Sequence, residues 1–347
     1  MLRGTAALFV AIGHIIGEMP RLRAYAGGFD ENIVQFRFGV DLFFVISGFI
    51  MVYTTCHRPR GVLAGGRFLL ARFLRLSPIY WGATALTVAI GLVLPSALNH
   101  EALSANRILS SLFYLPHRND NGDYFPIVGP GWTLNYEMFF YVIFALTFLL
   151  PWKRGLFALV GILGLAVLLG GIVPNSGPLF AYYSHPILLE FGYGALLGYA
   201  YVQGALDRLA PWILPTALLA VVWVAGLHLA NFADMQQRAF FYGVPATLLV
   251  FAAIVADRND RSAGGWAMLA LGDASYSIYL THLFVARAAS IVTARLLPGC
   301  PLWLFFAATL LAVVVVGYLV AQWVEIPLHH FTSRLTRPRR KVRTGEA

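Results

Sequence analysis

Charged side chains are scarce in this sequence. Asp, Glu, Lys and Arg make up 12% of the 347 residues, hydrophobic residues make up 59%, and the mean hydropathy is +0.71. A soluble domain carries about 25% charged residues, so this chain has too few to cover a surface that faces water. The shortage excludes a soluble globular protein and indicates a membrane protein.

Cysteine is also rare. The chain has two, Cys56 and Cys300, and neither belongs to a spacing that is typical of a metal site. They are expected at opposite sides of the membrane, which keeps them apart. The sequence therefore predicts no metal cofactor.

Apolar runs fill most of the chain, and many reach the ~20 residues that cross ~30 Å of hydrocarbon as a helix. Their backbone groups must form hydrogen bonds with each other within lipid. The Gly, Pro and aromatic residues that interrupt the runs favour helices over barrel strands. We predict an all-α, polytopic membrane protein with about ten transmembrane helices. They are expected at residues 2–19, 36–56, 76–97, 132–150, 156–173, 186–203, 211–229, 240–256, 268–295 and 302–326.

The net charge of +9 is distributed unevenly. Most of the 25 Lys and Arg residues fall in alternate connections between the expected helices and in the C-terminal tail. This distribution follows the positive-inside rule and places both termini in the cytoplasm of a bacterial inner-membrane protein. The charge therefore reflects topology, and no nucleic-acid partner is expected. We predict a transmembrane domain at 1–330 and a basic cytoplasmic tail at 331–347 that contacts membrane lipid.

Two connections are long. The inner segment 57–75 ends in an amphipathic stretch that is expected to lie along the membrane interface before the next helix begins at 76. The outer segment 98–131 is expected to contain a short helix near 104–115. The remaining connections are short, which predicts antiparallel neighbours in one membrane domain.

Ionisable residues inside the expected helices are functional candidates, because a charge at a helix centre costs from ~2.5 kcal/mol upward. Arg3 and His14 are eleven residues apart, about 1100° of helical rotation, so they share one face. Their axial separation is about 16 Å, which suits a ligand whose phosphates stay in the cytoplasm while its reactive end reaches inward. The alternative is a topological anchor at Arg3 and a packing residue at His14.

A second arginine pair, Arg72 and Arg75, also shares a helix face at the inner surface. Paired guanidinium groups suit bidentate phosphate binding, and lipid headgroup contact is the alternative. Asp41 and Glu137 are each about five residues inside the outer end of a helix. These carboxylates are candidates to orient a hydroxyl acceptor or the His14 imidazole, or else to form structural ion pairs or hydrogen bonds.

Depth across the membrane orders these groups. Arginines are expected at the inner face, His14 and His282 in the middle, and the two carboxylates in the outer half. Such a stack would let a cytoplasmic donor pass a group to an acceptor outside. Glu190 lies beside closely spaced glycines and is expected to hold helices together.

The same residues carry a resemblance to the acyltransferase-3 family of integral membrane acyltransferases, particularly its exopolysaccharide (succinoglycan-type) acetyltransferase branch. The stretch from Arg3 to His14 resembles the family's Arg-x10-His pattern, and Arg72 to Arg75 resembles its Arg-x-x-Arg. Further stretches that carry the resemblance are 38–50, 132–141, 275–282 and 325–328. The order and spacing are similar from residue 1 to about 330, and Thr133 stands where serine is usual.

The resemblance implies an acyl-CoA donor, usually acetyl-CoA, with His14 as the catalytic residue. It implies that Arg3, Arg72 and Arg75 bind or position CoA. Many relatives carry an attached extracytoplasmic domain that takes over the acyl group. Since these 347 residues include none, we expect direct O-acetylation of a polysaccharide or lipid-linked oligosaccharide.

The predicted mechanism has His14 as general base and Asp41 or Glu137 as an orienting group. The other candidate substrate-binding or oxyanion-stabilising residues are Trp132, Tyr136, Tyr141 and His282. An acyl-His14 intermediate stays open. The rival hypotheses are a proton-coupled transporter, which the absence of a visible inverted repeat disfavours, and the same chemistry on a small-molecule glycoside.

Overall fold

The computed structural model describes residues 1–22, 38–94, 103–118, 122, 124–173, 177–230, 232, 234, 236–258 and 265–336. Within these ranges the regular structure is helical, as the sequence predicts. The helices are α1 (Leu2–Glu18), α2 (Phe38–Thr55), α3 (Val62–Val93), α4 (Ala105–Leu112), α5 (Gly131–Leu146), α6 (Trp152–Ile172), α7 (Pro178–Tyr183), α8 (Leu188–Val202), α9 (Ile213–Leu229), α10 (Arg238–Phe241), α11 (Gly243–Arg258), α12 (Trp266–Asp273), α13 (Ser275–Leu296), α14 (Leu302–Val320) and α15 (Ile326–Thr336).

The helices have the lengths that a membrane protein needs. In the described part of the chain, eight helical segments are long and apolar enough to span a membrane. Two further expected helices, α8 and α9, are present but shorter, at 15 and 17 residues. The prediction of an all-α, multi-pass membrane protein is confirmed. The short outer helix expected near 104–115 is also present, as α4, and Ser104 caps it by accepting a hydrogen bond from the Arg107 amide.

Several expected boundaries differ from the structure. The helix expected at 268–295 is divided into α12 and α13 at Ala274. Residues 62–75 do not form a separate interfacial segment but are the first turns of α3, which runs unbroken for 32 residues. At 1.5 Å per residue this helix is about 48 Å long, well beyond the ~30 Å hydrocarbon layer. Its arginine-bearing turns therefore continue the axis of the membrane-spanning part.

The C-terminal helices are joined by a π-helical turn at Ala321–Glu325, which links α14 directly to α15. Such turns are rare and are frequent at functional sites. Helix α15 continues six residues past the boundary expected at 330, and most of the predicted basic tail, from 337, lies outside the described residues.

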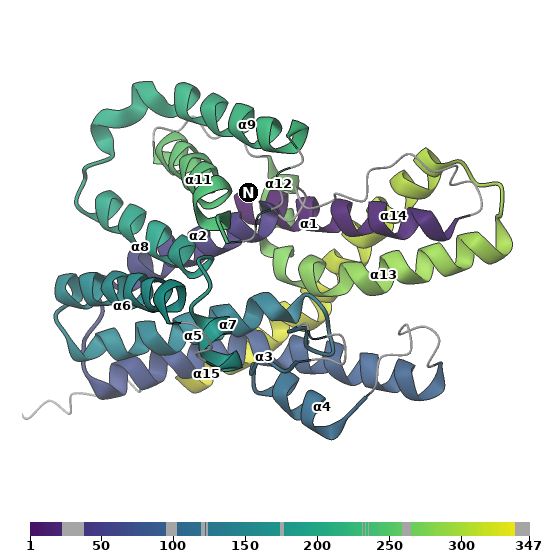
Figure 1. Cartoon of the computed structure of the whole chain (residues 1–347), viewed down its shortest axis with the longest axis horizontal. Coiled ribbons are helices and arrows are strands. Elements are labelled where there is room, and N and C mark those ends of the chain that lie inside the picture. Colours follow the sequence, from purple (N-terminus) through teal and green to yellow (C-terminus); the bar gives the residue numbers. More distant parts are fainter. Residues whose placement is uncertain are drawn as a thin grey trace, which may run out of the picture.

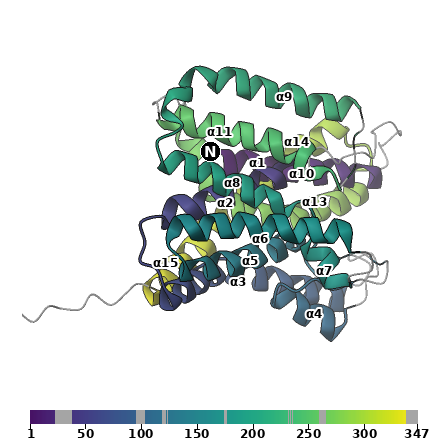
Figure 2. The ribbon, with the colours of Figure 1, turned by 60° about the vertical axis from the view of Figure 1, so that its left-hand side comes forward.

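Helix α2 is the centre of the packing. Figures 1 and 2 show α9 and α11 on one side of the molecule and α3, α5 and α4 on the other, with α2 and α8 between them. Helices α2 and α8 approach closely because glycines lie where they touch. A Cβ on Gly194 would lie 1.9 Å from the Val45 carbonyl oxygen, and a Cβ on Gly48 would lie 2.1 Å from the Phe191 carbonyl oxygen. Small residues let helix backbones approach in this way. Glu190 of α8 is buried against Gly243 of α11, as expected of a residue between helices.

Candidate active site

Three arginines that are distant in the sequence line one small cavity. Arg3 extends from the start of α1, and Arg72 and Arg75 extend from α3, around a space of about 60 Å³. None of the three guanidinium groups has a hydrogen bond or a carboxylate within 4.0 Å among the described residues. The Arg72 guanidinium lies over the rings of Phe68 and Tyr141, at 5.5 and 6.0 Å from their centroids. The hydrogen-bond donors of these arginines are therefore available to a ligand.

Glu137 lines the same cavity. Its Oε1 accepts hydrogen bonds from the Ser47 hydroxyl, at 3.0 Å, and from the Tyr141 hydroxyl. The expected separation of arginines and this carboxylate into inner and outer layers is wrong, because Glu137 and the arginines face one space. Its negative charge partly balances theirs.

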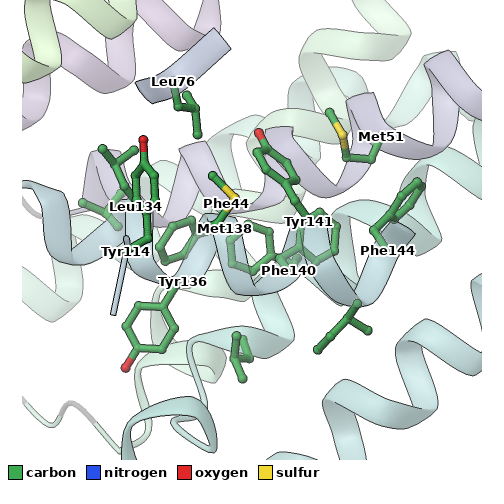
Figure 3. Packing of buried hydrophobic residues seen from close by; sticks show 14 of the residues in the cluster. Phe44, Met51, Leu76, Tyr114, Leu134, Tyr136, Met138, Phe140, Tyr141 and Phe144 are labelled. Carbon is green, nitrogen blue, oxygen red and sulfur yellow. The ribbon is translucent and has the colours of Figure 1, made fainter. Parts of the chain in front are cut away.

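The two tyrosines of α5 point in different directions. Tyr141 points toward the arginines, whereas Tyr136 lies on the opposite side of the helix (Figure 3). Tyr136 stacks on Tyr182 at 4.4 Å between ring centroids and donates a hydrogen bond to the Tyr182 carbonyl. Trp132 packs edge-on against Tyr136. The structure thus brings Tyr141 to the cavity and places Tyr136 and Trp132 in a neighbouring aromatic cluster.

His14 and His282 form a pair across α1 and α13. Nε2 of His282 lies 3.2 Å from Nδ1 of His14, and the ring centroids are 4.9 Å apart. His282 is fully buried and His14 is exposed. Their direct contact puts the two residues at one depth, as the sequence predicts.

Backbone carbonyls fix the protonation of this pair. Nδ1 of His282 lies 2.6 Å from the Tyr279 carbonyl oxygen, which can only accept, so we assign the proton to Nδ1 and leave Nε2 as an acceptor. Nδ1 of His14 faces this Nε2 and, at 2.9 Å, the Val10 carbonyl oxygen. Because both are acceptors, His14 carries its proton on Nδ1. Its Nε2 then holds the lone pair that a general base needs.

Tyr279 separates the histidine pair from the arginine cavity. Its ring lines the cavity, and its centroid is 5.9 Å from that of His282. Its hydroxyl lies 2.8 Å from the Thr133 hydroxyl, and both lie within hydrogen-bonding distance of the Pro130 carbonyl oxygen. The path from the arginines to the histidines therefore passes a buried polar group formed by α5 and α13.

Asp41 has a partner that the sequence analysis did not identify. Its two carboxylate oxygens accept hydrogen bonds of 2.8 and 2.7 Å from Nε and Nη2 of Arg238, and both side chains are buried. Asp41 does not line the arginine cavity. The sequence also offers Arg37, at the start of the helix expected at 36–56, as a cation for Asp41, but Arg37 lies outside the described residues. A buried carboxylate needs a cation beside it, and this need was the one sign in the sequence that Asp41 has a basic partner. Arg238 comes just before the apolar run 240–256.

Two of the stretches that carry the resemblance, 275–282 and 325–328, meet in space. Glu325, in the π-helical turn, accepts a hydrogen bond of 2.6 Å from the Ser277 hydroxyl on α13. On the same helix, Tyr276 lines the cavity and donates to the Leu76 carbonyl at 2.6 Å. Residues 275–282 thus connect the cavity, the histidine pair and the C-terminal helices.

Comparison with known proteins identifies the family. The acyltransferase domain that defines the acyltransferase-3 family matches residues 1–322. This chain belongs to that family. It is a multi-pass membrane acyltransferase, which favours acyl transfer over the transporter hypothesis.

Two curated relatives are similar to it. The exopolysaccharide production protein ExoZ of Rhizobium meliloti (strain 1021) is 32% identical over 291 residues, which cover 84% of this chain and 88% of the relative. Protein 2 in the picA locus of Rhizobium radiobacter is 31% identical over 162 residues, which cover 42% of this chain and 78% of the relative. No solved structure matches the chain at a significant level.

Proposed function

We propose that this acyltransferase moves an acetyl or other short acyl group from cytoplasmic acyl-CoA to a hydroxyl of an exopolysaccharide or another lipid-linked cell-surface glycan. The proposed location is the bacterial inner membrane. The name of the relative from Rhizobium meliloti, an exopolysaccharide production protein, supports the acceptor class. The observation that carries the proposal is the His14–His282 pair, which Tyr279 separates from a cavity lined by three arginines that form no ion pair within 4.0 Å among the described residues.

The donor fits the spacing of these groups. Arginines bind phosphate in a bidentate manner, so Arg3, Arg72 and Arg75 suit the phosphate end of a CoA thioester. The thioester end reaches toward His14, about 16 Å farther along α1. Thr133 and Tyr279 offer hydroxyl groups along this path.

In the proposed reaction, Nε2 of His14 removes the proton from the acceptor hydroxyl while its oxygen attacks the thioester carbonyl carbon. The tetrahedral intermediate collapses as the carbon–sulfur bond breaks. The thiolate leaves and takes the proton from His14, giving the sugar ester and free CoA. A positioned base contributes about 10²–10⁴ in rate. In this mechanism His282 orients the imidazole, and Glu137 stays with the donor-binding arginines.

The base role is tested with His14→Ala in membranes that contain a lipid-linked glycan and radiolabelled acetyl-CoA. Transfer of label to the glycan is expected to fall by about 10²–10⁴. His228→Ala, which changes an exposed histidine on α9, serves as the matched control and is expected to keep full activity. Near-wild-type transfer by well-folded His14→Ala protein would contradict the proposal. Replacing the glycan with a small glycoside in the same assay separates the two acceptor classes.

A further inference from the structure

A second, larger cavity opens beside the arginine cavity. Its volume is about 350 Å³, and it lies between the first turns of α3 and the C-terminal helix α15, which are neighbours in Figure 2. Arg58, Arg67, Arg72 and Arg75 line it, together with His329 and the Thr332 hydroxyl from α15. Arg72 and Arg75 line both cavities, so the two cavities are neighbours that share these side chains as a wall.

The lining of this second cavity is positively charged, and the carboxylate of Glu137 faces the neighbouring arginine cavity instead. Among the described residues that line it there is no carboxylate, and none lies within 4.0 Å of any of its four arginines. Arg58 and Arg67 are exposed, whereas Arg72 and Arg75 are half-buried. Four like charges around one concave space repel each other, and the repulsion is relieved when an anion enters. A topological role alone would not require them to face one space.

The number of arginines indicates the class of anion. Each guanidinium can form two parallel hydrogen bonds with one phosphate, so two pairs at different depths suit a ligand with two separate phosphate groups. The deeper pair also lines the smaller cavity, together with Arg3 and Tyr279. The exposed pair must therefore meet a phosphate that is farther from the reactive end.

We propose that Arg58 and Arg67 bind the 3′-phosphate of the donor nucleotide, while Arg72 and Arg75 bind its pyrophosphate, and that α15 forms one wall of this subsite. The proposal rests on the proposed acyl-CoA function. Its consequence is a choice of donor: CoA and acyl carrier protein share the phosphopantetheine arm, but only CoA has a 3′-phosphate. The enzyme would accept free acyl-CoA and reject an acyl carrier protein.

The test compares CoA with dephospho-CoA, which lacks the 3′-phosphate. Binding to purified full-length protein in phosphatidylcholine nanodiscs is measured by calorimetry. Wild-type protein is expected to bind CoA about tenfold more tightly than dephospho-CoA, as a charge-assisted phosphate contact would give. In Arg58→Gln/Arg67→Gln protein this ratio is expected to fall close to one, because CoA binds more weakly while the affinity for dephospho-CoA stays the same.

Arg154→Gln is the matched control, because Arg154 is an exposed arginine in the first turn of α6 and does not line the cavity. It is expected to keep the wild-type ratio. A double variant that binds CoA normally and keeps the ratio would overturn the subsite while leaving the acyl-CoA function intact. Wild-type protein that binds neither compound would overturn the donor itself.

An anionic lipid headgroup offers the same phosphate chemistry, so a further arm adds phosphatidylglycerol to the nanodiscs. Phosphatidylglycerol can weaken CoA binding to wild-type protein through the general negative charge of the lipid surface alone. In that case the double variant is still expected to bind CoA and dephospho-CoA with similar affinity. If the double variant changes lipid binding and leaves the CoA ratio unchanged, the cavity binds lipid and the proposal is wrong.

Discussion

Nδ1 of His14 and Nε2 of His282 lie 3.2 Å apart, although 268 residues separate them in the chain. One ring is exposed and the other is fully buried. The buried ring is held by a backbone carbonyl, so it acts as a fixed acceptor for the proton of the exposed ring. In the proposed mechanism His282 is therefore a positioning residue, comparable to the third member of a catalytic triad.

Replacing His282 tests this role. His282→Leu removes the acceptor, and acyl transfer is expected to fall by about tenfold to a hundredfold because His14 loses its preferred tautomer and orientation. His282→Gln offers an amide oxygen to the His14 proton and is expected to recover part of the activity. Initial rates in membranes, normalised to the amount of folded protein, provide the measurement. Equal loss in the leucine and glutamine variants would show that His282 serves packing alone.

The Asp41–Arg238 pair leads to a prediction about stability. Removing one partner of a buried ion pair typically costs about 3–5 kcal/mol, because the other charge is left without compensation. Asp41→Asn and Arg238→Gln are each expected to lower the unfolding midpoint in detergent. The double variant is expected to lose less than the sum of the two.

Arg287→Gln is the control for this pair, since Arg287 is 27% exposed where it meets Glu18. A smaller loss of stability is expected there. If Asp41→Asn protein unfolds like the wild type but transfers acyl groups a hundredfold more slowly, the orienting role predicted for Asp41 is supported instead.

The glycine contact between α2 and α8 can be tested by adding one methyl group. Gly194→Ala would place a Cβ 1.9 Å from the Val45 carbonyl oxygen, so the two helices must separate. Overpacking of this kind costs about 1–3 kcal/mol. Gly161→Ala on α6 is the control, because a Cβ added there would meet no neighbouring atom within 4 Å and alanine favours helix. Thermal unfolding should rank the control at or above the wild type and Gly194→Ala below it.

His185, between α7 and α8, gives a prediction about pH. Burial, and then the positive charge of Arg238, lower the pKa of His185 to about 4. Its Nδ1 accepts a hydrogen bond from the Ile187 amide, so the folded protein holds it neutral. Between pH 6.5 and 4 the unfolded chain binds a proton there that the folded chain does not. Stability is therefore expected to fall as the pH decreases through this window, by up to about 3 kcal/mol.

His185→Gln removes this titration. The unfolding midpoint of the variant is expected to change less than that of the wild type between pH 6.5 and 4. Parallel curves for the two proteins would contradict the assignment.

The helices were predictable because each long apolar run has one solution in lipid, an internally hydrogen-bonded helix. The start of α3 was not, since the charges of Arg67, Arg72 and Arg75 indicated an amphipathic segment at the membrane interface and not the first turns of a membrane-spanning helix. Long arginine side chains can extend from a continuous helix to the polar surface. The charges of 62–75 therefore did not show that this stretch continues into the next helix.

The site was predictable only in part. The spacing of Arg3 and of the Arg72–Arg75 pair identified cavity residues, but not that the two groups share one space. Tyr136 and Tyr141 are five residues apart, about 140° of rotation, so helical geometry alone shows that both cannot face this cavity. The partner of Asp41 is 197 residues away, and such pairings depend on how helices assemble.

Helix α3 is continuous, but it contains Pro78, three residues after Arg75. Proline cannot donate a hydrogen bond to the carbonyl of Leu74, so the helix is weakest there. Bending at this joint would swing the half that carries Trp81 relative to the half that carries the arginines. The arginine-bearing half and the Trp81-bearing half of α3 therefore meet at the one turn of this helix where proline removes a backbone hydrogen bond.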